Sequence, residues 1–185
     1  MALKTVNRGN RWRLAGWGAA AVLPLVPLVA MQFTDEVNWS LADVVVFGAL
    51  LACAGAAFEL AVRMSQSTAY RAAAGVGLAA AFLLVWVNGA VGIIGSEDNP
   101  ANLMYAGVLA IGLAGAAIAR LRPRGMARTL VAMAVAQALV AVIAFPAEPG
   151  YVPFAATIFF GALWLAAAWL FRRAALEPAR ADAVP

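Results

Sequence analysis

The sequence predicts an all-α protein of the membrane, a polytopic bundle of six transmembrane helices. The chain has 185 residues, of which 65% are hydrophobic and only 12% are charged, with a mean hydropathy of +0.87. Soluble chains carry roughly 25% charged residues. The basic residues are also grouped in clusters. Each apolar stretch between two clusters is long enough for two spanning helices of about 20 residues. Helices are expected because backbone amides in hydrocarbon must pair within their own segment.

The expected spans follow the apolar stretches in order and form three hairpins. They cover about 14–33, 41–62, 72–94, 101–119, 129–145 and 154–171, between a basic arm at 1–13 and a tail at 172–185. Pro24 and Pro27 predict a bend in the first span, because proline removes a hydrogen bond and clashes one turn back. The alternative for this first span is a cleaved signal peptide.

Two capping patterns mark the starts of spans. Ser40 precedes Asp43 by three residues, and a hydroxyl cap with an acid at that spacing satisfies free amides of the first turn. Asn99 and Pro100 mark the start of the fourth span, since an asparagine caps well and a proline at the first helical position loses nothing. Asn99-Pro100-Ala101 is also the tripeptide of aquaporin-type channels, but only one copy is present, and we expect capping.

The orientation follows from the basic residues. The 13 lysines and arginines fall in clusters at Lys4 to Arg13, Arg63 with Arg71, Arg120 to Arg128, and Arg172 to Arg180. With the N-terminus inside, the inner segments hold 4, 2, 4 and 3 of them and the outer turns hold none. The positive-inside rule therefore predicts an N-in/C-in protein. The basic pI is explained by these helix ends, so the expected partner is the lipid bilayer and no nucleic acid is expected.

The residue inventory limits the chemistry. The chain has no histidine, and Cys53 is the one cysteine. Histidine-ligated haem, histidine-containing zinc sites and Ser-His-Asp catalysis are therefore excluded. Lys4, the one lysine, lies in the polar arm, so a Schiff base buried in the bundle is excluded as well. No catalytic residue and no cofactor are predicted.

A polar, glycine-rich segment lies around the turn between the third and fourth spans. Its carboxylates and amides could bind a cation or a polar solute at the outer surface. The candidate polar or cation site consists of Asn88, Glu97, Asp98 and Asn102, with the metal unknown. The alternative, which we favour, is a structural turn with packed glycines and a capped helix.

Two further polar residues lie within expected spans. Glu59 is a carboxylate inside a span, where an ionisable group points to function by default. Arg63 lies one turn later, however, and an ion pair with it would explain Glu59 without function. Gln137 and Asn88 are the deeper polar groups, and we expect them to make hydrogen bonds between helices.

Small residues recur at helical spacing on two spans. Ala106, Ala110 and Ala114 share one face of the fourth span, and Ala134 and Ala138 share one face of the fifth. Such spacing lets helix backbones approach closely in a bilayer. It favours association through these faces, either within a homo-oligomer or with another membrane protein.

Two segments carry a resemblance to a known group. The run from Trp86 to Tyr105, together with Arg122-Pro-Arg-Gly-Met-Ala-Arg, resembles an uncharacterised family of small multi-pass bacterial inner-membrane proteins. The resemblance covers about 30–171. It implies a multi-pass protein of the bacterial inner (plasma) membrane, and it implies no activity.

The sequence therefore favours a non-catalytic accessory or scaffold protein. The alternative is a small transporter or channel, with an outward-facing polar or cation site between helices 3 and 4. A membrane enzyme is the least favoured function, because few residues could carry catalysis. The first is preferred because too few polar groups face the membrane centre to line a permeation path.

Overall fold

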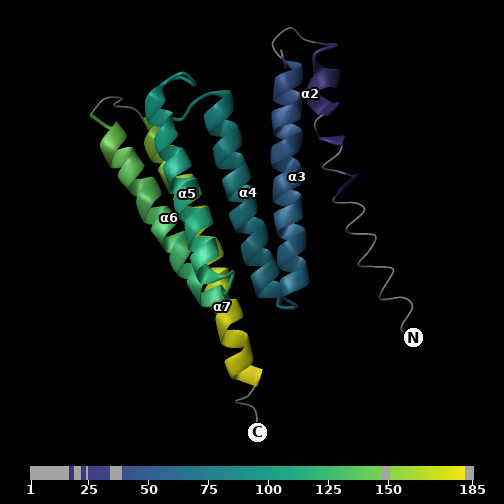
Figure 1. The fold of residues 1–185 in the computed structure, drawn as a ribbon. Coiled ribbons are helices and arrows are strands. Elements are labelled where there is room, and N and C mark those ends of the chain that lie inside the picture. Colours follow the sequence, from purple (N-terminus) through teal and green to yellow (C-terminus); the bar gives the residue numbers. More distant parts are fainter. Residues whose placement is uncertain (1–16, 19–21, 24, 34–38, 147–150, 182–185) are drawn as a thin grey trace. The chain divides into compact units, whose positions relative to one another are not determined.

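Every regular element within the described part of the chain is helical in the computed structural model (Figure 1). The structure describes residues 17–18, 22–23, 25–33, 39–146 and 151–181. The helices are α2 (Leu25–Ala30), α3 (Leu41–Met64), α4 (Thr68–Ala90), the 3-10 helix η1 (Pro100–Leu103), α5 (Met104–Ala119), α6 (Pro123–Ala144) and α7 (Tyr151–Ala181). The predicted all-α fold class is confirmed for these residues.

The chain divides into two compact units, of which the first comprises Met1–Ala57. It contains α2 and most of α3. The aromatic rings of Trp39 and Phe47 meet edge to face, with centroids 5.4 Å apart. The indole of Trp17 lies against α3 at Gly55, where an added Cβ would be 3.0 Å from the ring. Aromatic contacts therefore organise the described part of this unit.

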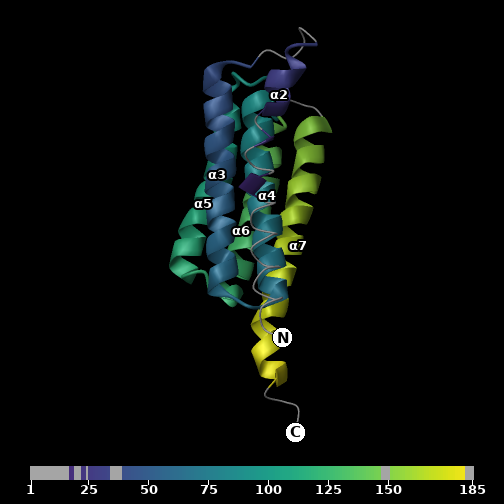
Figure 2. The same cartoon turned by 90° about the vertical axis from the view of Figure 1, so that its right-hand side faces the viewer.

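The second unit, Phe58–Pro185, contains the end of α3 and an up-and-down bundle of α4 to α7 (Figures 1 and 2). Helix α6 packs against both α5 and α7, and α4 packs against α7. Short connections between successive helices make antiparallel neighbours. The core of this bundle is one hydrophobic cluster, and Trp164 is its largest fully buried side chain.

Side-chain caps define where α3 and α4 begin. The backbone amide of Ser40 donates to Asp43 Oδ2 at 2.8 Å, and the amide of Asp43 donates to Ser40 Oγ at 3.2 Å. This reciprocal pair confirms the predicted start of the second span. Helix α4 is capped by Ser67, whose hydroxyl oxygen accepts from the amide of Tyr70 at 3.0 Å. Because of that cap, α4 begins at Thr68, four residues before the expected start at Ala72.

Arg71 closes the turn between α3 and α4. Its Nε donates to the carbonyl of Ser65 at 2.8 Å, and its Nη2 donates to the carbonyl of Val62 at 3.1 Å. These are carbonyls that the end of a helix leaves unpaired. The second basic cluster thus holds a turn together in addition to carrying charge.

The turn between α5 and α6 is unusually tight. Arg120 and Leu121 both have positive φ, 48° and 57°, a conformation that costs a residue with a side chain about 1 kcal/mol or more. The hydroxyl of Tyr70 donates to the carbonyl of Leu121 at 2.9 Å and so ties this turn to α4. Pro123 then occupies the first position of α6. The helix begins there instead of at 129, because a proline suits a first helical position.

Other expected boundaries also differ from the structure. The third span was expected to reach 94, but α4 ends at Ala90, and Gly92 and Gly95 follow with positive φ. The last span was expected to end at Phe171 before a tail, but α7 continues to Ala181. Its extension is rich in alanine and arginine, which are strong helix formers.

The first expected span lies partly outside the described residues. Residues 14–16, 19–21 and 24 are not described, and the regular helix within the described remainder is α2. The basic arm at 1–13 is likewise outside the described residues. A sixth spanning helix and its bend at Pro24 and Pro27 therefore stay predictions.

Five of the described helical segments are long and apolar enough to cross a membrane. They are Leu41–Met64, Thr68–Ala90, Pro100–Ala119, Pro123–Ala144 and Val152–Glu177. A bilayer core needs about 20 apolar residues at 1.5 Å each. The fold is therefore that of a multi-pass membrane protein.

Glycines, and not the predicted alanines, bring α5 and α6 together. A Cβ at Gly112 would lie 2.8 Å from Met133 Sδ, and a Cβ at Gly115 would lie 2.9 Å from Thr129 Cβ. The predicted alanine face, at Ala106, Ala110 and Ala114, is exposed instead. On α6, Ala134 packs against the core and Ala138 is exposed. Glycine is used because only the absence of Cβ allows this approach.

We expect Gly115→Ala to destabilise the bundle by about 1–3 kcal/mol, because the new methyl group meets the stiff, branched side chain of Thr129. Gly107→Ala on the same helix is the matched control, since no atom lies within 4 Å of its added Cβ. The control should be neutral or stabilising by up to about 1 kcal/mol. Thermal unfolding in detergent measures both, and an equal effect of the two variants would contradict this account of the α5–α6 contact.

Candidate functional site

The loop between α4 and α5 folds around one buried side chain, Asn102. Its Oδ1 accepts from the amides of Ile93 and Ile94 at 3.1 and 2.9 Å. Its Nδ2 donates to the carbonyls of Ile94 and Ser96 at 3.3 and 2.7 Å. An amide side chain has two acceptor positions and two donors, so all four are used. Asn102, 5% exposed, therefore holds the loop and has no position free for a ligand.

The surrounding residues fit this structural role. Asn99 caps η1, with its Oδ1 accepting from the amide of Ala101 at 3.0 Å, and Pro100 follows at the first helical position. The predicted capping is confirmed. Gly92 has a φ of +68°, and an added Cβ would collide with the backbone of Ser96. The loop thus needs glycine at this position to close around Asn102.

Asn88 lies beside Asn102, as the predicted site required. Its Nδ2 donates to the backbone carbonyl of Asn102 at 3.3 Å, which links α4 to η1. Its Oδ1 is buried and has no hydrogen-bond partner among the described residues. This contact is the interhelical hydrogen bond that the sequence predicted for Asn88.

Glu97 and Asp98 are both exposed on the same loop. Within the described residues, no group of three or more histidine, cysteine or acidic side chains is arranged to hold a metal. A calcium ion takes 6–8 oxygen ligands, and Asn102 has none to offer. The cation site therefore stays a prediction that depends on these two carboxylates.

Glu59 is paired. Arg63 Nε donates to Glu59 Oε1 at 3.0 Å, and Nη2 of the same arginine lies 3.0 Å from that oxygen. The pair spans one turn of α3 and confirms the structural explanation of Glu59. Its energy is small, about 0.5 kcal/mol, because Arg63 is largely exposed.

Gln137 lies in the centre of the bundle with no exposed surface. The described residues provide no hydrogen-bond partner for either atom of its amide, so its predicted interhelical bond is not made by the side chain. The backbone carbonyl of Gln137 does accept from the hydroxyl of Thr157 at 3.4 Å, which links α6 to α7.

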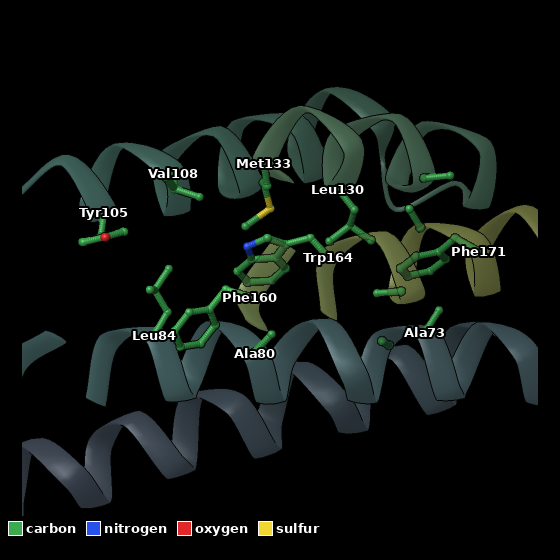
Figure 3. Close-up of a cluster of buried hydrophobic side chains, with 14 of the residues drawn as sticks. Ala73, Ala80, Leu84, Tyr105, Val108, Leu130, Met133, Phe160, Trp164 and Phe171 are labelled. Atoms are coloured by element: carbon green, nitrogen blue, oxygen red, sulfur yellow. The ribbon is translucent and has the colours of Figure 1, made fainter. Parts of the chain in front are cut away.

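Sequence reasoning missed two residues that share this property. The indole Nε1 of Trp164 and the hydroxyl of Tyr105 are buried and also have no partner among the described residues. Neither was predicted to be a functional residue. The available signal was their amphipathic character, since buried tyrosine and tryptophan usually find a hydrogen-bond partner. Figure 3 shows both side chains within the hydrophobic cluster.

The fold and these residues define a class: a helical, multi-pass membrane protein whose interior is apolar except for a few uncharged polar groups. Comparison with known proteins does not narrow that class. No protein-family model matches the chain, and no match was found among curated proteins or solved structures.

We expect Asn102→Leu to disrupt the α4–α5 loop. The similar size of leucine keeps the packing, but the amides of Ile93 and Ile94 lose their acceptor at a cost of about 1–3 kcal/mol each. Asn99→Ala is the control, because it removes only a helix cap worth about 1 kcal/mol. Thermal unfolding and protease cleavage between 92 and 99 measure the effect. If both variants behaved alike, the loop would not depend on Asn102.

Proposed function

We propose that the chain is a non-catalytic accessory or scaffold protein of the bacterial inner membrane. The observation that supports this proposal is the closed interior of α4 to α7. Ala80, Leu84 and Gln137 have no exposed surface, and Trp164 is 1% exposed. No charged side chain is among the buried ones that the structure describes. A permeation path needs polar groups that line a continuous route, so this interior favours a role in helix packing and association.

The partner in this proposal is another membrane protein or a second copy of the chain. Helix α5 presents the exposed alanine face of Ala106, Ala110 and Ala114 on the side opposite Tyr105 and Val108, which lie in the core. In lipid, small residues are the common basis of close helix contacts. The proposal includes the full topology: six spanning helices with both termini in the cytoplasm.

Association is tested with Ala110→Leu, which adds bulk at the centre of the exposed alanine face. Cross-linking and co-purification in mild detergent should drop several-fold, whereas the monomer should keep its stability, because surface changes usually cost within about 0.5 kcal/mol. Ala132→Leu is the matched control, since Ala132 is exposed on α6. A cross-linked fraction that both variants leave unchanged would reject this surface of α5.

Topology is tested with single cysteines in a Cys53→Ala background. A membrane-impermeant maleimide should label Ser96→Cys from the outside of intact cells and Arg124→Cys only after the membrane is opened. The expectation follows from the arginines on one side of the bundle and the acidic α4–α5 loop on the other. Labelling of position 124 in intact cells would overturn the N-in/C-in arrangement.

A small transporter or channel is the second candidate function. It is favoured by two observations: Oδ1 of Asn88 is buried without a partner among the described residues, and the carboxylates of Glu97 and Asp98 are exposed on the loop that follows α4. Calorimetry with divalent cations should then show binding to the wild type that Glu97→Gln/Asp98→Asn removes. Equal heats for both proteins would end the cation-site hypothesis and leave the scaffold proposal untouched.

A further inference from the structure

Several buried, uncharged polar atoms of the α4–α7 bundle have no hydrogen-bond partner among the described residues. They are both amide atoms of Gln137, Nε1 of Trp164, the hydroxyl of Tyr105 and Oδ1 of Asn88. No described residue gives any of them a hydrogen bond. These residues come from four different helices of one packed unit. Buried polar groups in native proteins are nearly always hydrogen-bonded, so this set calls for a partner other than the described residues.

Gln137 and Trp164 lie on helices that face one another. The hydrogen bond from Thr157 places the backbone of Gln137 against α7, two turns before Trp164 on that helix. Met133 lies one turn before Gln137 on α6. Figure 3 shows its thioether beside the ring edge of Trp164 that carries the nitrogen. Met133 therefore packs beside the indole of Trp164 and lies one helical turn from Gln137.

Met133 is also the side chain best able to move. Methionine is unbranched and has three rotatable bonds, so it adapts to irregular space. Its sulfur packs against α5 where Gly112 has no side chain, at 2.8 Å from the position a Cβ would occupy. In the described packing, each unpartnered polar atom is fully covered. A change of rotamer at Met133 would therefore alter the packing beside the indole nitrogen of Trp164.

The chemistry of these groups selects an uncharged ligand. Gln137 offers one acceptor oxygen and two N–H donors, and Trp164 offers one N–H donor. A hydroxyl oxygen can accept from the indole N–H, and a hydroxyl proton can be donated to Gln137 Oε1. The buried polar residues described, Asn102, Thr129 and Gln137, are all neutral. An ion would therefore be buried without a counter-charge, which is energetically costly.

We propose that Gln137 and Trp164 form an occluded site for a small hydroxyl-bearing molecule, with Met133 as the side chain that moves to admit it. Two sources share this chemistry. One is water, which in protein interiors typically bonds to two to four polar groups. The other is a small uncharged polyol, for which glycerol serves as the probe. The site goes beyond the scaffold proposal, since an occluded ligand is compatible with a closed bundle.

The direct test uses the full chain in lipid nanodiscs with ¹⁵N-labelled tryptophan. The chain has six tryptophans, so the indole resonance of Trp164 can be assigned with Trp164→Phe or by elimination of the other five. We expect the downfield shift of a hydrogen-bonded indole, together with either an exchange cross-peak to water or a saturable shift on addition of glycerol. The first result identifies water and the second identifies a polyol. An upfield, non-bonded indole with neither response would overturn the proposal.

A second measurement uses the sign of a stability change. If Gln137 binds a hydroxyl group, Gln137→Leu should lower the Tm by about 2–4 °C for each hydrogen bond lost. If the amide has no partner, leucine should raise the Tm, because an unpaired buried polar group is removed. The matched control is Thr129→Val, on the same helix, whose hydroxyl already donates to the carbonyl of Gly125 at 3.2 Å. Loss of that bond should lower the Tm of the control by a similar amount, and an unchanged or raised Tm of Gln137→Leu relative to the wild type would reject the site.

Discussion

The pairing of backbone polar groups in apolar surroundings is the constraint on which this structure depends. Helices satisfy it along their length, but each helix end leaves amides or carbonyls unpaired. Here, single side chains satisfy them at the turns. Arg71 bonds to carbonyls at the end of α3, Tyr70 bonds to the turn after α5, and Asn102 bonds to both donors and acceptors of the α4–α5 loop. A chain with so few polar residues therefore uses many of them as structural connectors.

The same constraint explains which polar side chains remain available to bind a ligand. Asn102 and Glu59 were candidate functional groups with a structural role as the favoured alternative, and both are bonded within the chain. Gln137 was expected to bond between helices and Trp164 was not predicted to be functional, yet their polar atoms lack partners among the residues described. Functional potential in this bundle lies with buried groups that remain unpaired, because each represents hydrogen-bonding energy that a ligand can recover.

Local chemistry could be predicted from the sequence with good accuracy. The caps at Ser40 and Asn99, the pair of Glu59 and Arg63, and the helical class all depend on neighbours within about one turn. Helix boundaries that depend on weaker local signals were predicted less accurately. Helix α4, for example, begins at Thr68 after the cap Ser67, and not at Ala72 as expected. Local signals could not predict whether Asn102 is available to a cation. The direction of its side chain depends on the fold of the whole loop.

The sequence by itself determined that the chain is helical, that its apolar segments are long enough to span a membrane, and where charge and caps interrupt them. Only the tertiary structure decided which helix faces meet. It placed Gly112 and Gly115 in the α5–α6 contact, left Ala110 outside, and enclosed Gln137. The physical reason is that these helices are apolar on every side. Without a hydrophobic contrast between faces, periodicity shows which residues share a face, and only close packing selects the face that turns inward.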